Sequence, residues 1–173
     1  MKPFKVYVKW VGDAVKEALY VKGENNDKVL ARADGLLGFM TWTFSPRDPR
    51  LMDGNRHPIT EIGFGFIIEM MRRDVPKALE LGELTPPQAQ DEVFDGKPVK
   101  RYEFAFTPAE GRKYYADKII LHVDKEHHLP VAVACYDAAG QLLEQYAYKD
   151  LKVNVGLSQT DFCKTNKEYR FGG

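Results

Sequence analysis

Hydrophobic and polar residues alternate along most of this chain with a period of two, which is typical of β-strands that are buried on one face. The apolar positions of "PFKVYVKWV" share one face of such a strand: Phe4, Val6, Val8 and Trp10. The alternation returns in segments such as "KEALYVKG", "FMTWTF", "KPVKRYEFAF" and "QLLEQYAYKDLKV". We predict about nine strands, nearly all joined by short turns, which favours an antiparallel meander over alternating βαβ units.

Two of these strand segments carry further information. "QDEVF" and "KPVKRYEFAF" are separated by Asp95-Gly96, a pair that tolerates positive φ and predicts a tight hairpin turn. "LPVAVACY" is apolar on both faces, with valines on one side and alanines on the other. A sheet that contains such a strand needs cover on both faces, and small residues on one face leave room that larger ones would fill.

One segment, "RHPITEIGFGFIIEMM", has helical spacing instead. Pro58 suits a first helical turn, and the apolar stripe recurs every three or four residues: Ile59, Ile62, Phe66, Ile67 and Met70. Asp74-Val75-Pro76 predicts a break and a restart over "KALELGEL". Because glycine has no side chain, Gly63 and Gly65 in this segment lead us to expect that a neighbouring backbone packs closely against the helix there.

Composition limits the class of protein. With 173 residues we expect a single domain over residues 1–173, large enough for a core without metal or disulfide support. The formal net charge is zero, which argues against nucleic acid as a partner and against an electrostatic membrane anchor. No apolar run reaches the ~20 residues that would span a bilayer. A strand that starts at the first residues leaves no room for a signal peptide and predicts a chain trimmed at its front.

Residues that carry catalysis or bind metals are scarce. The four histidines are His57, His122, His127 and His128, and no cysteine lies at a zinc-like spacing from them. We expect solvated histidines, no metal, no cofactor and no enzyme activity. For Cys135 and Cys163 we predict two free thiols, the first buried and the second in a polar loop, although an oxidising compartment would permit a disulfide.

The segments "KPFKVYVKWVG", "RHPITEIGFGFIIEMM" and "LPVAVACYDAAGQLLEQYAYKDLKVNVGLSQTDF" resemble a bacterial family of exported proteins, the domain of unknown function numbered fifteen seventy-one. The resemblance extends from Lys2 to about Phe171. This family is similar to the wider group that shares the fold of the lipoprotein carrier LolA and its receptor LolB. It implies a mainly β (α+β) fold, with a strongly curved antiparallel sheet forming an open half-barrel and one or two helices covering the concave face. Members begin with a helix and early strands that this chain lacks, so we expect the amino-terminal part of the fold to be missing.

Two functions follow from this reading. The first is non-catalytic binding of a lipid, an acyl chain or another hydrophobic ligand in the half-barrel cavity, in a periplasmic or otherwise exported protein. Its expected lining residues are Trp10, Trp42, Phe66, Ile67 and Met70, although ordinary core packing is the favoured explanation for any one of them taken singly. The alternative is a structural or interaction domain with a solid core that pairs through a sheet edge. A pocket of a few hundred Å3 favours the first, and a filled interior favours the second.

Overall fold

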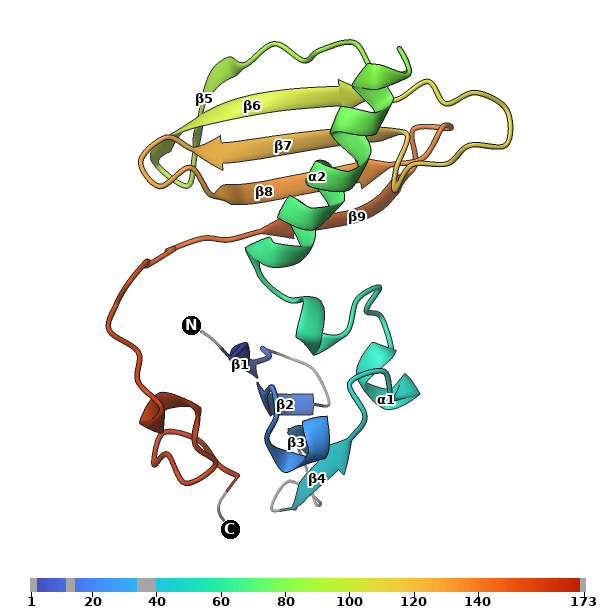
Figure 1. Ribbon diagram of the computed structural model, residues 1–173. Helices are drawn as coiled ribbons and strands as arrows, with labels where there is room; N and C mark the ends of the chain where they lie inside the picture. Colours follow the sequence, from blue (N-terminus) through green and yellow to red (C-terminus); the bar gives the residue numbers. More distant parts are fainter. Residues whose placement is uncertain (1–2, 12–14, 34–39, 172–173) are drawn as a thin grey trace. The chain divides into compact units, whose positions relative to one another are not determined.

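The computed structural model describes residues 3–11, 15–33 and 40–171 of the chain (Figure 1). Within these ranges, nine strands form two antiparallel sheets, one of four strands and one of five. The predicted mainly β fold with about nine antiparallel strands and few helices is confirmed, and the strands are shared between two open sheets where the sequence suggested one. The sheets belong to two compact units, residues 1–62 with 153–173 and residues 63–152. One domain over the whole chain stays a prediction.

The four-stranded sheet has the order β1 (Lys5–Lys9), β2 (Val15–Val21), β3 (Val29–Ala33), β4 (Thr41–Phe44). Its register aligns one row of side chains across all four strands: Val8, Ala18, Ala31 and Trp42. Cross-strand partners lie on the same face of a sheet, so these four share a face with the next row, which includes Tyr20 and Val29. The residues that alternate along β1 in the sequence therefore lie on opposite faces of the sheet.

Each face of this sheet is covered by a different segment. Helix α1 (Pro49–Met52) and the 3-10 turn η3 (Ile59–Glu61) lie on the face of Ala18, where Leu51 and Ile59 join the core. The opposite face packs against the chain's last part, which contains the 3-10 turn η4 (Thr160–Phe162) and buries Phe171. The tail is mainly polar, but its aromatic residues reach the apolar side chains of the strands, so it packs on the face of the sheet.

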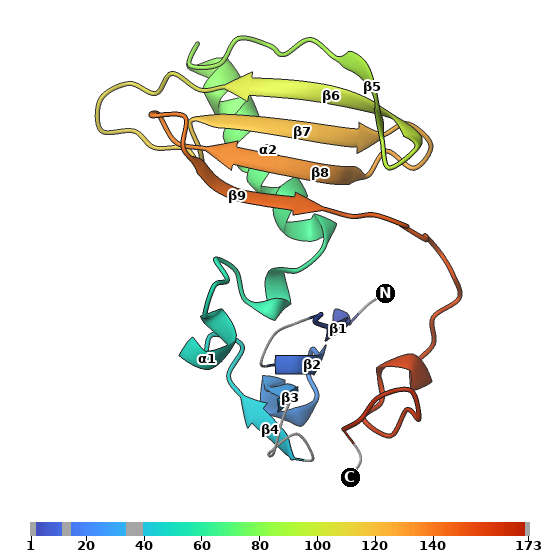
Figure 2. The same ribbon diagram turned by 180° about the vertical axis from the view of Figure 1, so that it is seen from behind.

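The five-stranded sheet runs in sequence order: β5 (Gln90–Phe94), β6 (Lys97–Ala105), β7 (Lys118–Asp124), β8 (Pro130–Tyr136) and β9 (Leu142–Ala147). Helix α2 (Phe64–Glu80) lies across one face, in front of the sheet in Figure 1 and behind it in Figure 2. The core between helix and sheet includes Ile67, Met70, Ile119, Val133 and Cys135. The sheet therefore has one face under a helix, as the sequence predicted.

The turn between β5 and β6 is the hairpin predicted from Asp95-Gly96. Both residues have positive φ, 50° and 72°, and the flanking strands pair from Phe94 with Lys97 outward.

Cys135 is buried and Cys163 is exposed, and both are free thiols as predicted. The apolar β8 is buried at nearly every position.

The long helix differs from the prediction at its start and in its middle. Ile59–Glu61 form a 3-10 turn, and α2 begins only at Phe64 because Gly63, at φ 101°, turns the backbone out of the helical range. Gly65 has no neighbour within 4 Å of an added Cβ, so the expected close backbone approach is wrong. The predicted break at Pro76 is also wrong, since the helix runs through it to Glu80.

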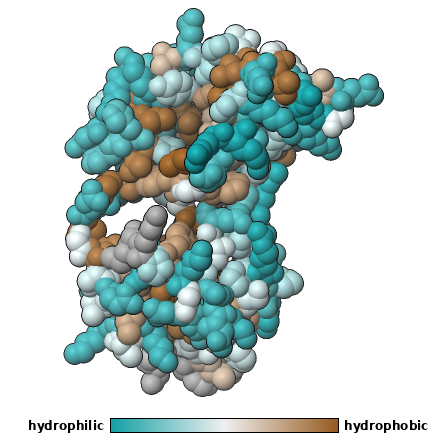
Figure 3. Space-filling view, in the orientation of Figure 1, coloured by the Kyte–Doolittle hydropathy of each residue, from teal (hydrophilic) through white to brown (hydrophobic). Residues whose placement is uncertain are grey.

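A buried carboxylate explains why the helix does not restart there. Asp74, the first residue of the predicted break, is buried. It accepts hydrogen bonds from the Arg73 side chain at 2.6 and 2.9 Å and from the backbone N–H of Tyr115 at 3.0 Å. Asp74 therefore ties α2 to the segment before β7. The face of the molecule seen in Figure 3 is mainly hydrophilic, with scattered hydrophobic patches.

Candidate functional site

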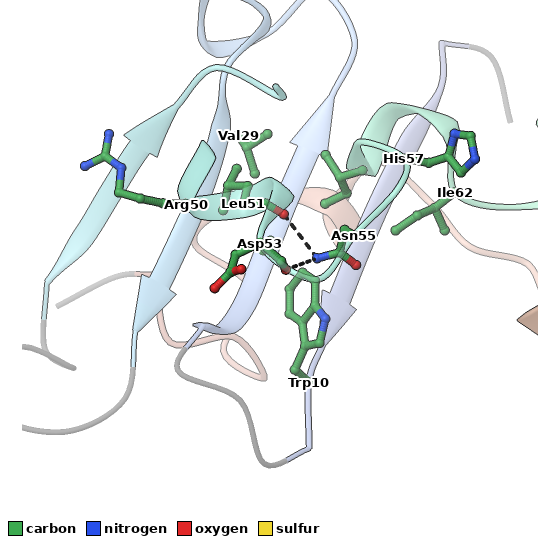
Figure 4. A pocket seen from close by; sticks show the side chains of 10 residues that line it. Trp10, Val29, Arg50, Leu51, Asp53, Asn55, His57 and Ile62 are labelled. Atoms are coloured by element: carbon green, nitrogen blue, oxygen red, sulfur yellow. Dashed lines mark hydrogen bonds between the residues drawn. The ribbon is translucent and has the colours of Figure 1, made fainter. Parts of the chain in front are cut away.

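A pocket of about 210 Å3 lies on the face of the four-stranded sheet that α1 and η3 cover (Figure 4). Its lining combines apolar side chains with a polar border: Trp10, Ala18, Val29, Arg50, Leu51, Asp53, Asn55, His57, Ile59 and Ile62. All of these belong to the same compact unit. The site is therefore a feature of the amino-terminal sheet and the loop segment that crosses it.

The pocket exists because the sheet presents small side chains where the covering segment crosses. Ala18 on β2 and Val29 on β3 line it from the sheet, and both are fully buried. Trp10 follows β1 on the same face, and Leu51 and Ile59 face it from the covering segment. An alanine and a valine do not fill the space between these larger groups, so a hollow remains.

An ion pair fixes the first turn of the covering segment. Asp48 caps α1 by accepting from the backbone N–H of Arg50 at 3.0 Å, and its carboxylate also takes two hydrogen bonds of 2.8 Å from the guanidinium of Arg50. These bonds from Arg50 lower the pKa of Asp48 to about 2. The same guanidinium lies 4.3 Å from the centre of the Phe44 ring on β4. Arg50 therefore anchors α1 to the edge of the sheet.

The remainder of the segment is held by its own polar groups. The Asn55 amide donates to the backbone carbonyls of Leu51 and Asp53, at 3.2 and 3.1 Å, which closes the turn after α1 (Figure 4). Glu61 bridges two side chains, with Arg47 at 2.7 Å and the Nδ1 of His57 at 2.8 Å. The side chains of Arg50, Asn55 and His57 on the polar border of the pocket are thus already engaged in local contacts, and the apolar wall provides contact surface for a ligand.

The structure places the five sequence-predicted lining residues in two groups. Trp10 lines the pocket, and Trp42 lies on the same face of the sheet without lining it. Phe66, Ile67 and Met70 belong to α2 in the other unit, where Ile67 and Met70 are buried and Phe66 packs against the same core. Their role as ligand contacts stays a prediction.

Sequence reasoning missed several lining residues because they come from a segment without regular periodicity. Leu51 lies in a four-residue helix, and Ile62 follows a 3-10 turn. The only sequence feature that pointed to Leu51 was the pair of apolar residues in "PRLMDG", and two residues are too few to define the apolar face of a helix or strand. Ile59 and Ile62 were recognised as apolar positions, but they were assigned to the long helix.

Histidines that the sequence offered as candidate ligands lie in local pairs. Across residues 3–11, 15–33 and 40–171, no group of three or more His, Cys, Asp or Glu side chains is placed to hold a metal ion. His122 pairs with Glu92 at 3.1 Å and His127 with Asp124 at 3.1 Å. In the same ranges, no helix has both the length and the apolar character needed to cross a bilayer.

The fold and the pocket define a mainly β protein with a small, partly apolar hollow on one sheet. The chain belongs to the family described as "Protein of unknown function (DUF1571)", whose model matches residues 1–171. The predicted family and the extent of the match are confirmed.

Two solved structures are similar to this chain. One is a LolA superfamily protein from Nitrosomonas europaea, 15% identical over 88% of this chain and 64% of that one, with a TM-score of 0.32. The other is a putative outer membrane lipoprotein-sorting protein domain from Vibrio parahaemolyticus, 17% identical over 91% of this chain and 79% of that one, with a TM-score of 0.32. This chain therefore spans less than two thirds of the first structure. No curated protein matches.

Proposed function

We propose that this protein is a non-catalytic protein of the cell envelope that binds an acyl chain or another hydrophobic ligand in the pocket beside Trp10. The observation that carries the proposal is the hollow of about 210 Å3 walled by Trp10, Leu51, Ile59 and Ile62. The resemblance of the sequence to the group of LolA and LolB supports the location in the envelope.

The size of the pocket restricts the ligand. Sites for drug-sized molecules measure about 300–1,000 Å3, and this pocket is smaller. It suits a short stretch of one acyl chain better than a complete lipid. The polar border of Arg50, Asp53, Asn55 and His57 leaves the head group of such a ligand in water.

The two tryptophans of the chain permit a direct test. In a Trp42→Phe background Trp10 is the single tryptophan, and a fatty acid brominated along its chain should quench its fluorescence in a saturable manner. Ile62→Lys places a charge on the apolar wall and should weaken binding at least about tenfold, because it opposes the burial of a methylene chain. Ile62 is 40% exposed, so the folded state should tolerate the change.

Ile68→Lys is the matched control. Ile68 is 47% exposed, belongs to α2 in the other unit and does not line the pocket. It should leave quenching unchanged. Quenching that does not saturate, or that is lost equally in both variants, would contradict the proposal.

A second candidate function is an interaction domain that pairs through a sheet edge. Strand β5 ends the five-stranded sheet, and its Val93 is 74% exposed. An edge strand with an exposed apolar residue is a template for strand addition. In this case the protein should associate with itself in analytical ultracentrifugation, and Val93→Lys, but not Ile62→Lys, should abolish that association.

A further inference from the structure

A second pocket lies on the opposite face of the four-stranded sheet. Its volume is about 310 Å3, larger than that of the first, and all of its lining belongs to the same unit. The sheet contributes Leu19, Val21 and Leu30, and the tail contributes Phe162, Cys163 and Lys164. This hollow is separated from the proposed acyl site by the thickness of the sheet, because Ala18 and Leu19 point to opposite faces of β2.

The hollow arises because the tail covers the face unevenly. Tyr169 stacks on Tyr7 of β1 with ring centres 3.8 Å apart, and Phe171 meets Tyr7 edge-on at 6.3 Å. The backbone N–H of Arg170 also donates to the buried carboxylate of Glu17 at 3.0 Å. These contacts hold one part of the tail firmly. Beside the connection from β2 to β3, which contains the 3-10 turn η1 (Asn25–Asp27), the stretch from Phe162 to Lys164 lines the hollow.

The charged groups around this pocket are mainly basic. Lys28, just before β3, and Lys164, in the tail, line the pocket, and Glu24 is the acidic residue in the lining. The Glu24 carboxylate accepts a hydrogen bond from the Gln159 side chain at 3.1 Å. The ammonium groups of Lys28 and Lys164 outnumber the carboxylate of Glu24, so the border of the pocket carries a net positive charge. The floor of the pocket, formed by the sheet residues Leu19, Val21 and Leu30, is apolar. Long lysine side chains suit this arrangement, since their methylenes cover apolar surface while the charge stays in water.

We propose that this pocket is a second binding site, which takes a single-chain amphiphile with an anionic head, such as a medium-chain carboxylate. The chain lies against Leu19, Val21, Leu30 and Phe162, and the carboxylate lies between Lys28 and Lys164. The apolar floor selects for the chain, and the basic border selects against a cationic head. The site is independent of the pocket at Trp10, so either can be correct without the other.

Cys163 provides a local reporter for this site. Its thiol is exposed and borders the pocket, whereas Cys135 is 0% exposed in the other unit. In the folded protein a neutral maleimide should therefore modify Cys163 and leave Cys135 intact, as mass spectrometry would show. A ligand in the pocket shields Cys163, and the rate of modification measures occupancy.

The experiment compares decanoate with decyltrimethylammonium, which has the same chain length and the opposite charge, below the micellar concentration of each. Decanoate at about ten times its dissociation constant should slow modification of Cys163 roughly tenfold. Each added methylene should tighten binding about fourfold until the pocket is full. Acetate, which has the charge without the chain, should have no effect. Equal slowing by both amphiphiles, or by neither, would overturn the proposal.

Charge reversal tests the role of the border. With Lys28→Glu and Lys164→Glu together, protection by decanoate should disappear and protection by the cationic amphiphile should appear, each relative to the same variant without ligand. Lys167→Glu, also an exposed lysine of the tail but outside this lining, should behave like the unmodified protein. Persistent protection of the double variant by decanoate would also reject the site, as the basic border would then have no role.

Discussion

Asp74 is the residue whose charge couples helix α2 to the segment before β7. Burial raises the pKa of this carboxyl group, but the hydrogen bonds from Arg73 and from the backbone of Tyr115 lower it by more, so that the pKa lies below its ordinary value. A carboxyl group with a depressed pKa in the folded state stabilises that state above the unfolded pKa of about 3.9. This stabilisation is lost as the pH falls through the folded value.

We therefore expect Asp74→Asn to lower the free energy of unfolding at pH 7 by about 1–3 kcal/mol. The difference from the unmodified protein should narrow as the pH drops below about 4, where the unfolded carboxyl takes up its proton. Urea denaturation over a pH series would measure both effects. Asp53→Asn, at an exposed position, is the control and should shift stability little at any pH. A difference that stays constant down to pH 2 would contradict this account.

At the scale of elements, Pro76 distinguishes one continuous helix from two. A proline inside a helix removes the hydrogen bond to the carbonyl four residues earlier and is less favourable than alanine by about 3 kcal/mol, whereas a proline in a first turn is favourable. Pro76 is exposed and lies within α2. Pro76→Ala should therefore raise the free energy of unfolding by about 1–3 kcal/mol, as measured by chemical denaturation.

The adjacent exposed Lys77 supplies the comparison, and Lys77→Ala should change stability by no more than about 0.5 kcal/mol. If Pro76→Ala instead destabilised the protein, residue 76 would behave as the first turn of a separate helix.

The same region shows what the sequence can and cannot predict. Strand alternation identifies one element at a time, so Phe104 and Val133 were recognisable as inward-facing positions. Asp74-Val75-Pro76 looked like a helix boundary because the carboxylate partner, the backbone of Tyr115, lies 41 residues further along the chain. For the candidate site, Trp10 was predicted from its strand. Leu51 and Ile62 were not, because a loop is placed by contacts such as that of Arg50 with Phe44 and has no period of its own.

At the scale of the whole molecule, one compact unit is assembled from both ends of the chain. Residues 153–173 join residues 1–62, and the tail covers Leu19 and Val21. A chain truncated after Lys152 should therefore lose hydrogen-exchange protection in β2 and β3. The amides of β7 and β8 should keep theirs, since residues 63–152 form the other unit.

In the chain of residues 1–173, Tyr169→Ala combined with Phe171→Ala should reproduce the loss in β2 and β3 in part, because these two rings make the contacts with Tyr7. Loss of protection in both sheets to the same extent would contradict the assignment of the tail to the first unit.

The division of the first unit between two distant segments also sets an order of events during synthesis. Every residue of the unit 63–152 is made before residue 153 and therefore leaves the ribosome ahead of the tail, so that unit needs no later segment to complete its core. The strands β2 and β3 emerge earlier, yet the apolar face around Leu19 has no cover until Phe162 and Phe171 arrive. Chains grow at about 5–20 residues per second, and exposed apolar strands are prone to aggregate in that interval. We infer that the part made first matures last, and that a holding chaperone would act on the amino-terminal sheet.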